Sequence, residues 1–423
     1  MTIDHWITDA AARHPHKAAL FCENRSYDYG QMANAVAARA GWLRAEGIAR
    51  GDRVAWYGMN HEEVFFLLFA CARVGAMLVP LNWRLAEAEV AGIVADCAPK
   101  LVVHDAHFAG RAAQLADCTI VDAAAIPALA KTHVDATGEG ALSDALLIVY
   151  TSGSTGKPKG VVLAQAALVA NAEMSVEAHG LTPGDRVLNV LPMFHVGGLN
   201  ILPTPAFSIG ATVEIVERFE PPTALAALTR ANAAIMVPTV LGALMAQEGW
   251  SGADLSALRV MSIGSTDVPR GMIDAVQARC IPVVQIYGAT ETSPLAIYQR
   301  VDEALATTGS IGRVGSACEV RLADGTNEIL VRGANTLSEY WQNPAETARA
   351  IRDGWFYTGD VAEQDEEGLF WFRDRIKHVI ISGGENIYPA ELERVLNPHP
   401  AIAEVSVVGR PDAKWGEIPV AVV

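Results

Sequence analysis

The ten residues Thr151–Gly160 read TSGSTGKPKG and lie between two short apolar runs, Leu146–Tyr150 and Gly160–Leu163, that are typical of strands. Glycines allow successive backbone N–H groups to point at one anion, and hydroxyl and ammonium groups add further donors. Two of the chain's seven lysines fall in this stretch. It is not a Walker A loop, because its first two glycines are too close together and its first lysine precedes a proline, with no helix to follow. We interpret it as a loop that binds a polyphosphate; a flexible polar hairpin is the alternative.

The composition bounds the class of protein. With 423 residues, 51% of them apolar, the chain can bury more than one hydrophobic core, so we expect at least two lobes. A formal charge of −16 without a basic tract excludes a nucleic-acid coat or an anionic-membrane binder, and we expect no nucleic-acid partner. The longest apolar block, Val64–Ala72, is too short for a bilayer, which predicts a buried helix and no membrane-spanning segment. Six scattered cysteines and an N-terminus without a visible secretory signal favour a cytoplasmic protein.

Strand-like and helix-like runs alternate through most of the chain. The expected strands are Arg53–Tyr57, Gly75–Leu81, Ala234–Val237, Arg259–Ile263 and Val283–Tyr287, and the helices between them are Glu62–Arg73, Val240–Trp250 and Pro269–Arg279. This alternation predicts an α/β fold whose mainly parallel sheets carry helices on both faces. From Cys318 onward, short alternating strands with tight turns predict a small β-barrel-like subdomain.

Near the C-terminus the pattern changes again. We place a large lobe at residues 1–374, a hinge at 375–378 and a small, partial α+β lobe at 379–423. In that last lobe, Ser382–Asn386 is typical of a loop, Pro389–Leu396 of a helix opened by proline, and Ile402–Val408 of a strand. The chain stops inside an apolar run, so we expect this lobe to be incomplete.

Three of the expected strands are followed by short turns that share a character. In an open parallel sheet, ligands bind beyond the carboxyl ends of the strands. The segments at those ends are Pro238–Thr239, Gly264–Thr266 and Tyr287–Glu291, which gather small, hydroxylated and acidic residues at one edge of the sheet. For any one of them alone, ordinary turn chemistry is the better explanation.

Six motifs, in order and across nearly the whole chain, resemble the signatures of the acyl-adenylate-forming enzymes. That superfamily comprises acyl-CoA and aryl-CoA ligases, luciferases and the adenylation domains of peptide synthetases. The motifs are TSGSTGKPKG (Thr151–Gly160), LPMFH (Leu191–His195), GST (Gly264–Thr266), YGATE (Tyr287–Glu291), YTGD (Tyr357–Asp360), and RDRIK (Arg373–Lys377) with GGEN (Gly383–Asn386). Chance agreement is negligible, and the chain is identified as a member of this superfamily in its acyl-CoA ligase branch.

The resemblance implies a two-step reaction that uses ATP, Mg²⁺ and CoA. A carboxylate attacks the α-phosphate of ATP, giving acyl-AMP and pyrophosphate, and the thiol of CoA then takes the acyl group and releases AMP. Donors and a divalent cation stabilise the charge that builds on the phosphoryl oxygens. The catalytic residues implied are Thr151, Lys157, His195, Thr290 and Glu291, with Thr290 at the α-phosphate and Glu291 as the magnesium ligand.

The same resemblance assigns the nucleotide site. Tyr287 corresponds to the aromatic residue that stacks on adenine, Asp360 to the carboxylate that accepts both ribose hydroxyls, and Arg375 to the cation near ribose and phosphate. The remaining residues implied are Thr151, Ser152, Gly153, Ser154, Thr155, Gly156, Gly264, Ser265, Gly288 and Thr290. As isolated residues, Asp360 and Arg375 would more often be solvated surface charges.

The resemblance also implies the acyl and CoA sites. The acyl pocket comprises Phe194, His195, Gly197, Gly198, Gly264 and Ala289, with His195 as an aromatic gate. Amino-acid-activating members carry an aspartate in this region and this chain does not, which implies a fatty or aromatic acid without an α-amino group. Lys377 corresponds to the hinge, and Gly383 and Gly384 to a loop beside the pantetheine tunnel. Trp415 is equally explained by stacking on the adenine of CoA or by packing.

One departure from the family concerns a catalytic lysine near the end of the small lobe, which this chain lacks. After Lys377 its only lysine is Lys414, in a different motif. We therefore expect a truncated chain that binds ATP and acyl-AMP but adenylates slowly. The alternatives left open are an acyl-AMP ligase that loads a carrier protein, an ATP or acyl-AMP binding protein with little catalysis, and a luciferase-like oxygenase. The assembly that we expect is a homodimer.

Overall fold

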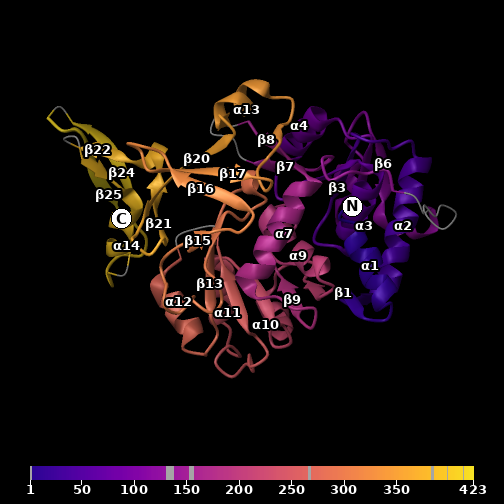
Figure 1. Cartoon of the computed structure of the whole chain (residues 1–423), viewed down its shortest axis with the longest axis horizontal. Coiled ribbons are helices and arrows are strands. Elements are labelled where there is room, and N and C mark those ends of the chain that lie inside the picture. The colour runs from indigo at the N-terminus through magenta and orange to yellow at the C-terminus, as the bar shows by residue number, and fades with distance from the viewer. Residues whose placement is uncertain are drawn as a thin grey trace.

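A computed structural model describes residues 2–129, 138–151, 157–264, 268–382, 385–397, 399–412 and 414–423. Within these ranges the strands form four sheets. The N-terminal helices lie at one end of an elongated molecule and the C-terminal strands at the other (Figure 1).

The first sheet has seven strands in the order β18-β8-β7-β4-β3-β5-β6. Their bounds are β3 (Arg53–Tyr57), β4 (Met77–Pro80), β5 (Leu101–His104), β6 (Thr119–Asp122), β7 (Ala145–Thr151), β8 (Lys159–Ala164) and β18 (Glu339–Tyr340). Strands β3 to β7 pair in parallel, whereas β8 is antiparallel to both β7 and β18. The predicted phosphate loop therefore joins two antiparallel strands, and no helix directly follows it.

The second sheet has nine strands in the order β15-β14-β13-β12-β11-β9-β10-β1-β2. Their bounds are β1 (Ala18–Cys22), β2 (Arg25–Asp28), β9 (Arg186–Asn189), β10 (Thr212–Ile215), β11 (Ala233–Met236), β12 (Val260–Ile263), β13 (Val283–Tyr287), β14 (Ile297–Tyr298) and β15 (Arg313–Val314). The six inner strands are parallel, and the edge strands β2, β14 and β15 are antiparallel. The predicted α/β class is confirmed.

Helices cover and separate these two sheets. Their bounds are α1 (His5–Arg13), α2 (Tyr29–Ala45), α3 (Glu62–Val74), α4 (Glu87–Cys97), α5 (Ala109–Ala112), α6 (Ile126–Leu129), α7 (Gln165–His179), α8 (Val196–Asn200), α9 (Pro203–Ser208), α10 (Pro221–Leu228), α11 (Pro238–Met245) and α12 (Arg270–Gln277). Every residue of α3 is buried, because this helix contacts β4 of the first sheet and β1 of the second. The predicted buried helix around Val64–Ala72 is thus confirmed, and its apolar character on all sides has a structural reason. Pro238 and Thr239, predicted to form a turn, instead open α11, where proline suits the first helical turn.

Two smaller antiparallel sheets complete the chain. One contains β16 (Cys318–Leu322), β17 (Glu328–Gly333), β19 (Ile351–Arg352), β20 (Trp355–Gln364) and β21 (Phe370–Arg375), with α13 (Pro344–Ala350) beside it; the other contains β22 (Ile380–Ser382), β23 (Glu385–Ile387), β24 (Ser406–Asp412) and β25 (Gly416–Val422), with α14 (Pro389–Leu396) against β24. The strand predicted at Ile402–Val408 is wrong in its bounds. Strand β24 begins at Ser406, because the hairpin with β25 decides which residues pair, from Ser406 opposite Val422 to Asp412 opposite Gly416.

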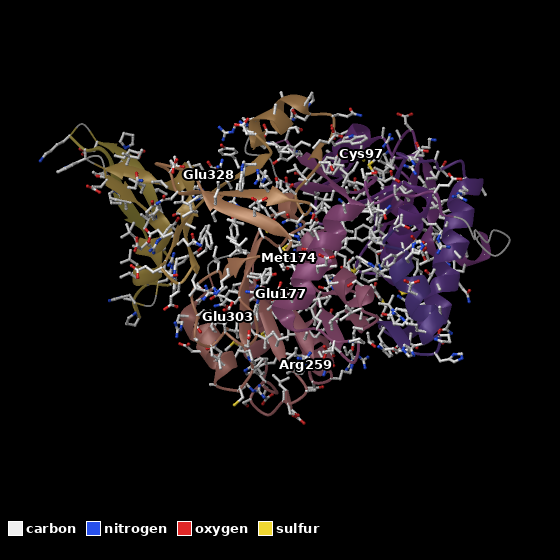
Figure 2. All side chains as sticks on the ribbon, viewed as in Figure 1. Cys97, Met174, Glu177, Arg259, Glu303 and Glu328 are labelled. Carbon is white, nitrogen blue, oxygen red and sulfur yellow. The ribbon has the colours of Figure 1, made fainter. Side chains whose placement is uncertain are left out.

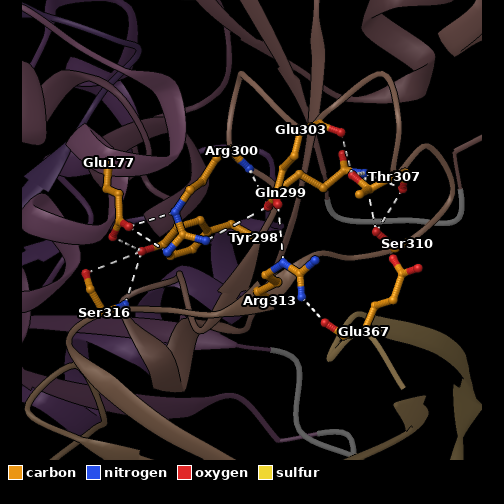
Figure 3. A network of polar contacts seen from close by, with 10 residues as sticks. All are labelled: Glu177, Tyr298, Gln299, Arg300, Glu303, Thr307, Ser310, Arg313, Ser316 and Glu367. Carbon is orange, nitrogen blue, oxygen red and sulfur yellow. Dashed lines mark hydrogen bonds and ion pairs between the residues drawn. The ribbon is translucent and has the colours of Figure 1, made fainter. Parts of the chain in front are cut away.

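A polar network ties α7 to the second sheet and to the small five-stranded sheet (Figure 3). Glu177, near the middle of the molecule in Figure 2, accepts hydrogen bonds from the Tyr298 hydroxyl at 2.6 Å and from Arg300 Nε at 2.7 Å. Arg313 Nε lies 3.2 Å from Glu303 Oε2, and the Arg313 guanidinium also donates to a backbone carbonyl in the turn between β20 and β21. The network therefore helps to hold the β20–β21 hairpin against the end of the nine-stranded sheet.

Replacing Glu177 with glutamine tests this network through its pH dependence. Burial alone would raise the pKa of the Glu177 carboxyl, but hydrogen bonds from Tyr298, Ser316 and Arg300 outweigh it and lower the pKa. A lowered pKa means that the stabilisation is present above the ordinary pKa of the carboxyl and is lost as the pH falls through the lowered value. We expect E177Q to lower the free energy of unfolding by about 1 kcal/mol at neutral pH, because the group is partly solvated.

Denaturant unfolding of E177Q and wild type at neutral pH and at about pH 3 measures this effect, and the difference between them should shrink at the lower pH. The control is the Glu173→Gln variant, since Glu173 is exposed on the same helix. An equal loss for both variants, or a loss that does not change with pH, would contradict the role given to Glu177.

Candidate functional site

The predicted phosphate loop begins where β7 ends. Thr151, half-buried at the end of β7, lies opposite Lys159 in β8. The loop residues between them, Ser152, Gly153, Ser154, Thr155 and Gly156, lie outside the described residues, as do Ser265 and Thr266 of the GST motif. The base of the hairpin is formed by β7 and β8, the third and second strands from one edge of the seven-stranded sheet.

The two lysines of this hairpin have different surroundings. Lys157 is exposed next to the loop. The ammonium of Lys159 pairs with the Glu346 carboxylate and lies 5.6 Å from the centre of the Tyr340 ring. Side chains alternate along a strand, so two lysines two residues apart within a strand would lie on the same face. Lys157 lies before the start of β8, and it therefore does not share the face on which Lys159 pairs with Glu346. Lys157 is thus available to a ligand, whereas Lys159 is held within the protein.

Three residues predicted to bind the nucleotide, from three different strands, meet in one cluster. Asp360 in β20 lies directly opposite Arg375 in β21. The hydroxyl of Tyr287, the last residue of β13, donates to Asp360 Oδ2 at 2.9 Å, and Arg375 Nε lies 3.2 Å from Asp360 Oδ1. The Asp360 side chain is 8% exposed and that of Arg375 is 57% exposed, so the carboxylate lies within the protein while the guanidinium faces solvent.

The electrostatics of this cluster suit an acceptor of hydroxyl groups. Burial raises the pKa of the Asp360 carboxyl above its ordinary value, although Arg375 and the hydrogen bond from Tyr287 act in the opposite direction. Burial and the Asp360 carboxylate raise the pKa of Tyr287, so its hydroxyl remains a donor. Asp360 Oδ1 accepts no directed hydrogen bond from the part of the chain that the structure describes. Arg375 balances the charge at Oδ1, and a carboxylate oxygen that accepts no directed hydrogen bond keeps acceptor capacity for a diol.

The turn after β13 is tightly packed and requires glycine at Gly288, the first residue after the strand. A Cβ atom on Gly288 would lie 1.6 Å from the carbonyl oxygen of Pro294. The backbone N–H of Ala289 donates to Thr292 Oγ1 at 2.9 Å, and residues Thr290–Thr292 form one turn of 3₁₀-helix. Thr290 and Glu291 are therefore presented at the carboxyl end of β13, beside Tyr287, as the motif predicts.

Glu291 is joined to the hairpin by a residue that the sequence analysis missed. The Tyr340 hydroxyl donates to Glu291 Oε1 at 2.8 Å, and Leu337 N donates to the Glu291 backbone oxygen, also at 2.8 Å. Tyr340 belongs to β18, which pairs with β8 so that Tyr340 lies opposite Val161. Burial, and then the Glu291 carboxylate, raise the pKa of Tyr340. Only the pairing of β18 with β8 brings this tyrosine to Glu291, because β18 is two residues long and carries no recognisable motif.

The donor set around Glu291 fits a magnesium ion carried in by a nucleotide. In the described ranges, no group of three or more His, Cys, Asp or Glu side chains is arranged to hold a metal by itself. Glu291 instead offers one hard carboxylate, half-buried beside the phosphate hairpin. Mg²⁺ typically keeps several waters and binds through one or two carboxylates together with substrate phosphates. Glu291 would hold such an ion together with the phosphates of the nucleotide.

The predicted acyl side begins at the start of α8. The rings of Phe194 and His195 lie 4.4 Å apart, and Trp83 meets Phe194 edge-on at 6.0 Å. Loss of hydration among neighbouring groups lowers the pKa of the His195 imidazole even though this residue is exposed, and the positive charge of Arg84 acts in the same direction. An uncharged imidazole suits a residue that separates an acyl group from a nucleotide.

The four small residues predicted to line the acyl pocket have different environments. A Cβ on Gly197 would meet only Ile201, at 3.8 Å, so space is open there. A Cβ on Gly198 would lie 2.3 Å from the carbonyl oxygen of Pro192, so this glycine permits close packing of the backbone. Gly264 approaches Ile286, which a Cβ would meet at 3.0 Å, and Ala289 is half-buried in the turn after β13.

A cavity of about 370 Å³ lies on the Arg84 side of Phe194. It is lined by Asn60, Trp83, Arg84, Val190, Pro192, Glu217, Arg218 and Phe219. It adjoins the aromatic residues just described, and its wall carries two arginines and one glutamate.

The residues assigned to the hinge and CoA site lie in or beside the C-terminal sheet. Lys377 is exposed in a single 3₁₀ turn, Ile376–His378, and lines a cavity of about 530 Å³. Gly383 and Gly384 lie outside the described residues. Trp415 is 48% exposed, with the Lys414 ammonium 4.7 Å from its ring, so it is not packed in a core.

None of the helices in the described ranges has the length and apolar character that crossing a bilayer requires.

Known proteins share this architecture. The AMP-binding enzyme family matches residues 7–341, and the AMP-binding enzyme C-terminal domain matches residues 391–423. The chain is 43% identical to the indoleacetate–CoA ligase of Aromatoleum aromaticum, over 100% of this chain and 88% of that protein. The o-succinylbenzoate CoA synthetase of Bacillus subtilis, solved in complex with its acyl-adenylate intermediate, is 29% identical with a TM-score of 0.86, over 98% of this chain and 87% of that one. ATP-bound MatB from Rhodopseudomonas palustris is 27% identical with a TM-score of 0.90, over 100% of this chain and 88% of that one. The chain therefore belongs to the AMP-binding enzyme family, and the superfamily membership that its motifs predicted is confirmed.

Proposed function

We propose that this AMP-binding enzyme is a CoA ligase for an aromatic carboxylic acid of the arylacetate class. The observation that carries the proposal is the convergence of Tyr287, Asp360 and Arg375 at the edge of the sheet where Glu291 meets the phosphate hairpin. This cluster offers acceptors for a ribose and, next to it, ligands for a polyphosphate. A nucleotide bound across both would direct its α-phosphate toward Thr290 and His195.

The chemistry follows from what these groups supply. Asp360 and Tyr287 orient the nucleoside, and the phosphate hairpin with Lys157 donates to the phosphoryl oxygens, so that the acid oxygen can attack in line. A magnesium ion at Glu291 would neutralise charge on the departing pyrophosphate. The acyl-AMP that results is activated because AMP is a far better leaving group than oxide. The thiol of CoA then displaces AMP and forms the thioester.

The aromatic preference is supported by the residues on the acyl side. Phe194, His195 and Trp83 provide ring surfaces, and Gly197 leaves open space that a bulkier side chain would fill. Flat ring surfaces and missing side chains suit a planar ring better than a flexible alkyl chain. The relative that acts on indoleacetate, which matches over the full length of this chain, points to the same class.

AMP release with CoA, measured over indoleacetate, phenylacetate, benzoate, hexanoate and palmitate, tests the substrate class. We expect the highest kcat/KM for an arylacetate, since its ring reaches the pocket while the methylene keeps the carboxylate at the α-phosphate. A fatty acid as the best substrate would overturn the proposal. Replacing CoA by a phosphopantetheinylated carrier protein separates a CoA ligase from a carrier-loading ligase.

Replacing Gly197 with valine should narrow the pocket. We expect the KM for indoleacetate to rise about tenfold or more, and the KM for benzoate to change less, because a smaller ring avoids the added methyl groups. The matched control is the Gly92→Val variant, in which valine is placed in the exposed face of α4, where nothing lies within 4 Å. Equal changes for both acids would show that Gly197 does not line the acyl pocket.

The proposal includes a cytoplasmic enzyme that forms a homodimer. All six cysteines are free, and the Cys22 and Cys71 side chains are buried, which agrees with a reducing compartment. Sedimentation of the purified chain tests the dimer, and fractionation of the producing cells tests the location.

A further inference from the structure

We propose that Tyr340 is a positioning residue for Glu291, and that it thereby governs how tightly the enzyme takes up ATP together with its magnesium ion. The inference rests on the proposed function, because it assigns Tyr340 to the same nucleotide site.

The contact itself is specific. A glutamate side chain has several rotamers, and holding it in one of them costs conformational entropy. The Tyr340 hydroxyl donates to Glu291 Oε1 at 2.8 Å, which selects one rotamer. It occupies one carboxylate oxygen and leaves the other for a cation. Partners of this kind, bound to the ligand and not to the metal, orient the ligand.

Tyr340 is itself fixed from several directions. It is 6% exposed, and its backbone N–H donates to Thr347 Oγ1 at 2.9 Å. The Lys159 ammonium, paired with Glu346, lies against its ring at 5.6 Å. These contacts fix the position of the Tyr340 hydroxyl, and its hydrogen bond in turn restricts the Glu291 carboxylate.

The same segment also connects Glu291 to the phosphate hairpin. Leu337 N donates to the Glu291 backbone oxygen, and two residues later β18 pairs with β8, the strand that leaves the hairpin. The carboxylate and the hairpin thus share one short piece of chain as a support. Two groups that must bind the same polyphosphate and its cation are held at a set separation before the ligand arrives, which lowers the entropic cost of binding.

If Tyr340 served only to stabilise the fold, its ring would supply most of the stabilisation. The Tyr340→Phe variant keeps that ring and removes only the hydroxyl. The matched control is Tyr298→Phe, since Tyr298 is also buried and its hydroxyl also donates to a glutamate, Glu177, at 2.6 Å. Both variants lose one part-buried hydroxyl-to-carboxylate hydrogen bond, and Y298F also removes the acceptor of the Ser316 N–H, so Y298F should lose at least as much thermal stability as Y340F. Only Y340F removes the hydrogen bond to Glu291.

The decisive measurement is the dissociation constant of ATP by calorimetry on the intact chain, without acid or CoA, in saturating Mg²⁺ and in EDTA. We expect Mg²⁺ to tighten ATP binding by wild type and by Y298F to the same extent. In Y340F the tightening should fall about tenfold, while binding in EDTA stays within about twofold of wild type. The Mg²⁺ concentration that half-saturates AMP release should rise in parallel.

A double-mutant cycle with Glu291→Gln shows whether Tyr340 acts through Glu291. Adding Y340F to E291Q should then have no further effect on the Mg²⁺ dependence. An unchanged Mg²⁺ effect in Y340F, an equal change in Y298F, or a full additional loss in the double variant would each overturn the inference. Because calorimetry needs no acid, failure of every acid to release AMP would count against the proposed function alone. If Mg²⁺ did not change the dissociation constant of ATP for the wild type, that result would overturn the role of Glu291 and, with it, this inference.

Discussion

Replacing Asp360 with asparagine is expected to weaken AMP binding by about a hundredfold and to leave the folded chain as stable as wild type, or more stable, at neutral pH. Two hydrogen bonds from ribose hydroxyls to a carboxylate contribute about 3 kcal/mol together, because each is charge-assisted. An amide has one acceptor oxygen and no charge, and the Tyr287 hydroxyl, which donates to Oδ2 in wild type, would compete for it.

The D360N substitution should weaken AMP binding but should not weaken folding, because the Asp360 carboxylate is buried. The pKa of Asp360 is raised in the folded chain, so folding favours its protonated form. The corresponding stabilisation is present below the ordinary pKa of an aspartate and is lost as the pH rises through the raised value. At neutral pH the folded chain holds a buried carboxylate at a cost, which Arg375 offsets in part, and asparagine removes that cost.

Calorimetry of AMP binding and thermal unfolding at neutral pH measure the two effects together. The Asp324→Asn variant, changed at an exposed turn of the same small sheet, is the control and should alter neither quantity. Wild-type affinity in D360N would remove Asp360 from the nucleotide site. A large loss of stability would show that the Tyr287 and Arg375 contacts outweigh the cost of burial.

Replacing Gly288 with alanine is expected to abolish AMP release and to lower the thermal midpoint. The added Cβ would lie 1.6 Å from the Pro294 carbonyl oxygen and 2.7 Å from Thr292 Oγ1, so the backbone of the turn must move. Overpacking of this kind costs about 1–3 kcal/mol or more. A shift of about 1 Å in reacting groups can cost about a hundredfold in rate, and this turn carries Thr290 and Glu291.

The matched control is Gly197→Ala, because the new Cβ there meets only Ile201, at 3.8 Å. Initial rates of AMP release and thermal unfolding of both variants give the comparison. We expect G197A to keep its thermal midpoint and most of its activity. Equal behaviour of the two variants would mean that the turn after β13 can relax without moving the site.

Much of the architecture followed from local patterns. Alternating apolar strands and helices predicted the α/β class, and the uniformly apolar run Val64–Ala72 predicted a helix buried on all sides, which α3 is. The hairpin around Thr151–Gly160 was predicted between two strands, and β7 and β8 flank it. These predictions succeeded because each depends on residues that are neighbours along the chain.

Contacts between residues that are distant in the sequence could not be predicted in the same way. The YGATE and YTGD motifs indicated that Tyr287 and Asp360 serve one nucleotide, but not that their side chains hydrogen-bond to one another. Nothing near Tyr340 indicated its contact with Glu291, and nothing distinguished Lys159, which is paired with Glu346, from the exposed Lys157.

The order and composition of its motifs alone determined the family of this protein and its reaction class, and they predicted a loop for a polyphosphate, because glycines, hydroxyls and lysines carry that chemistry wherever a chain places them. Only the tertiary structure decided how the site is assembled. Strand pairing brings β18 to β8, and the packing of the five-stranded sheet against the nine-stranded sheet brings Asp360 in β20 to Tyr287 at the end of β13. Burial and backbone hydrogen bonding over the whole chain set both the register and this packing. Which tyrosine supports which carboxylate is a consequence of that register, and no short segment contains it.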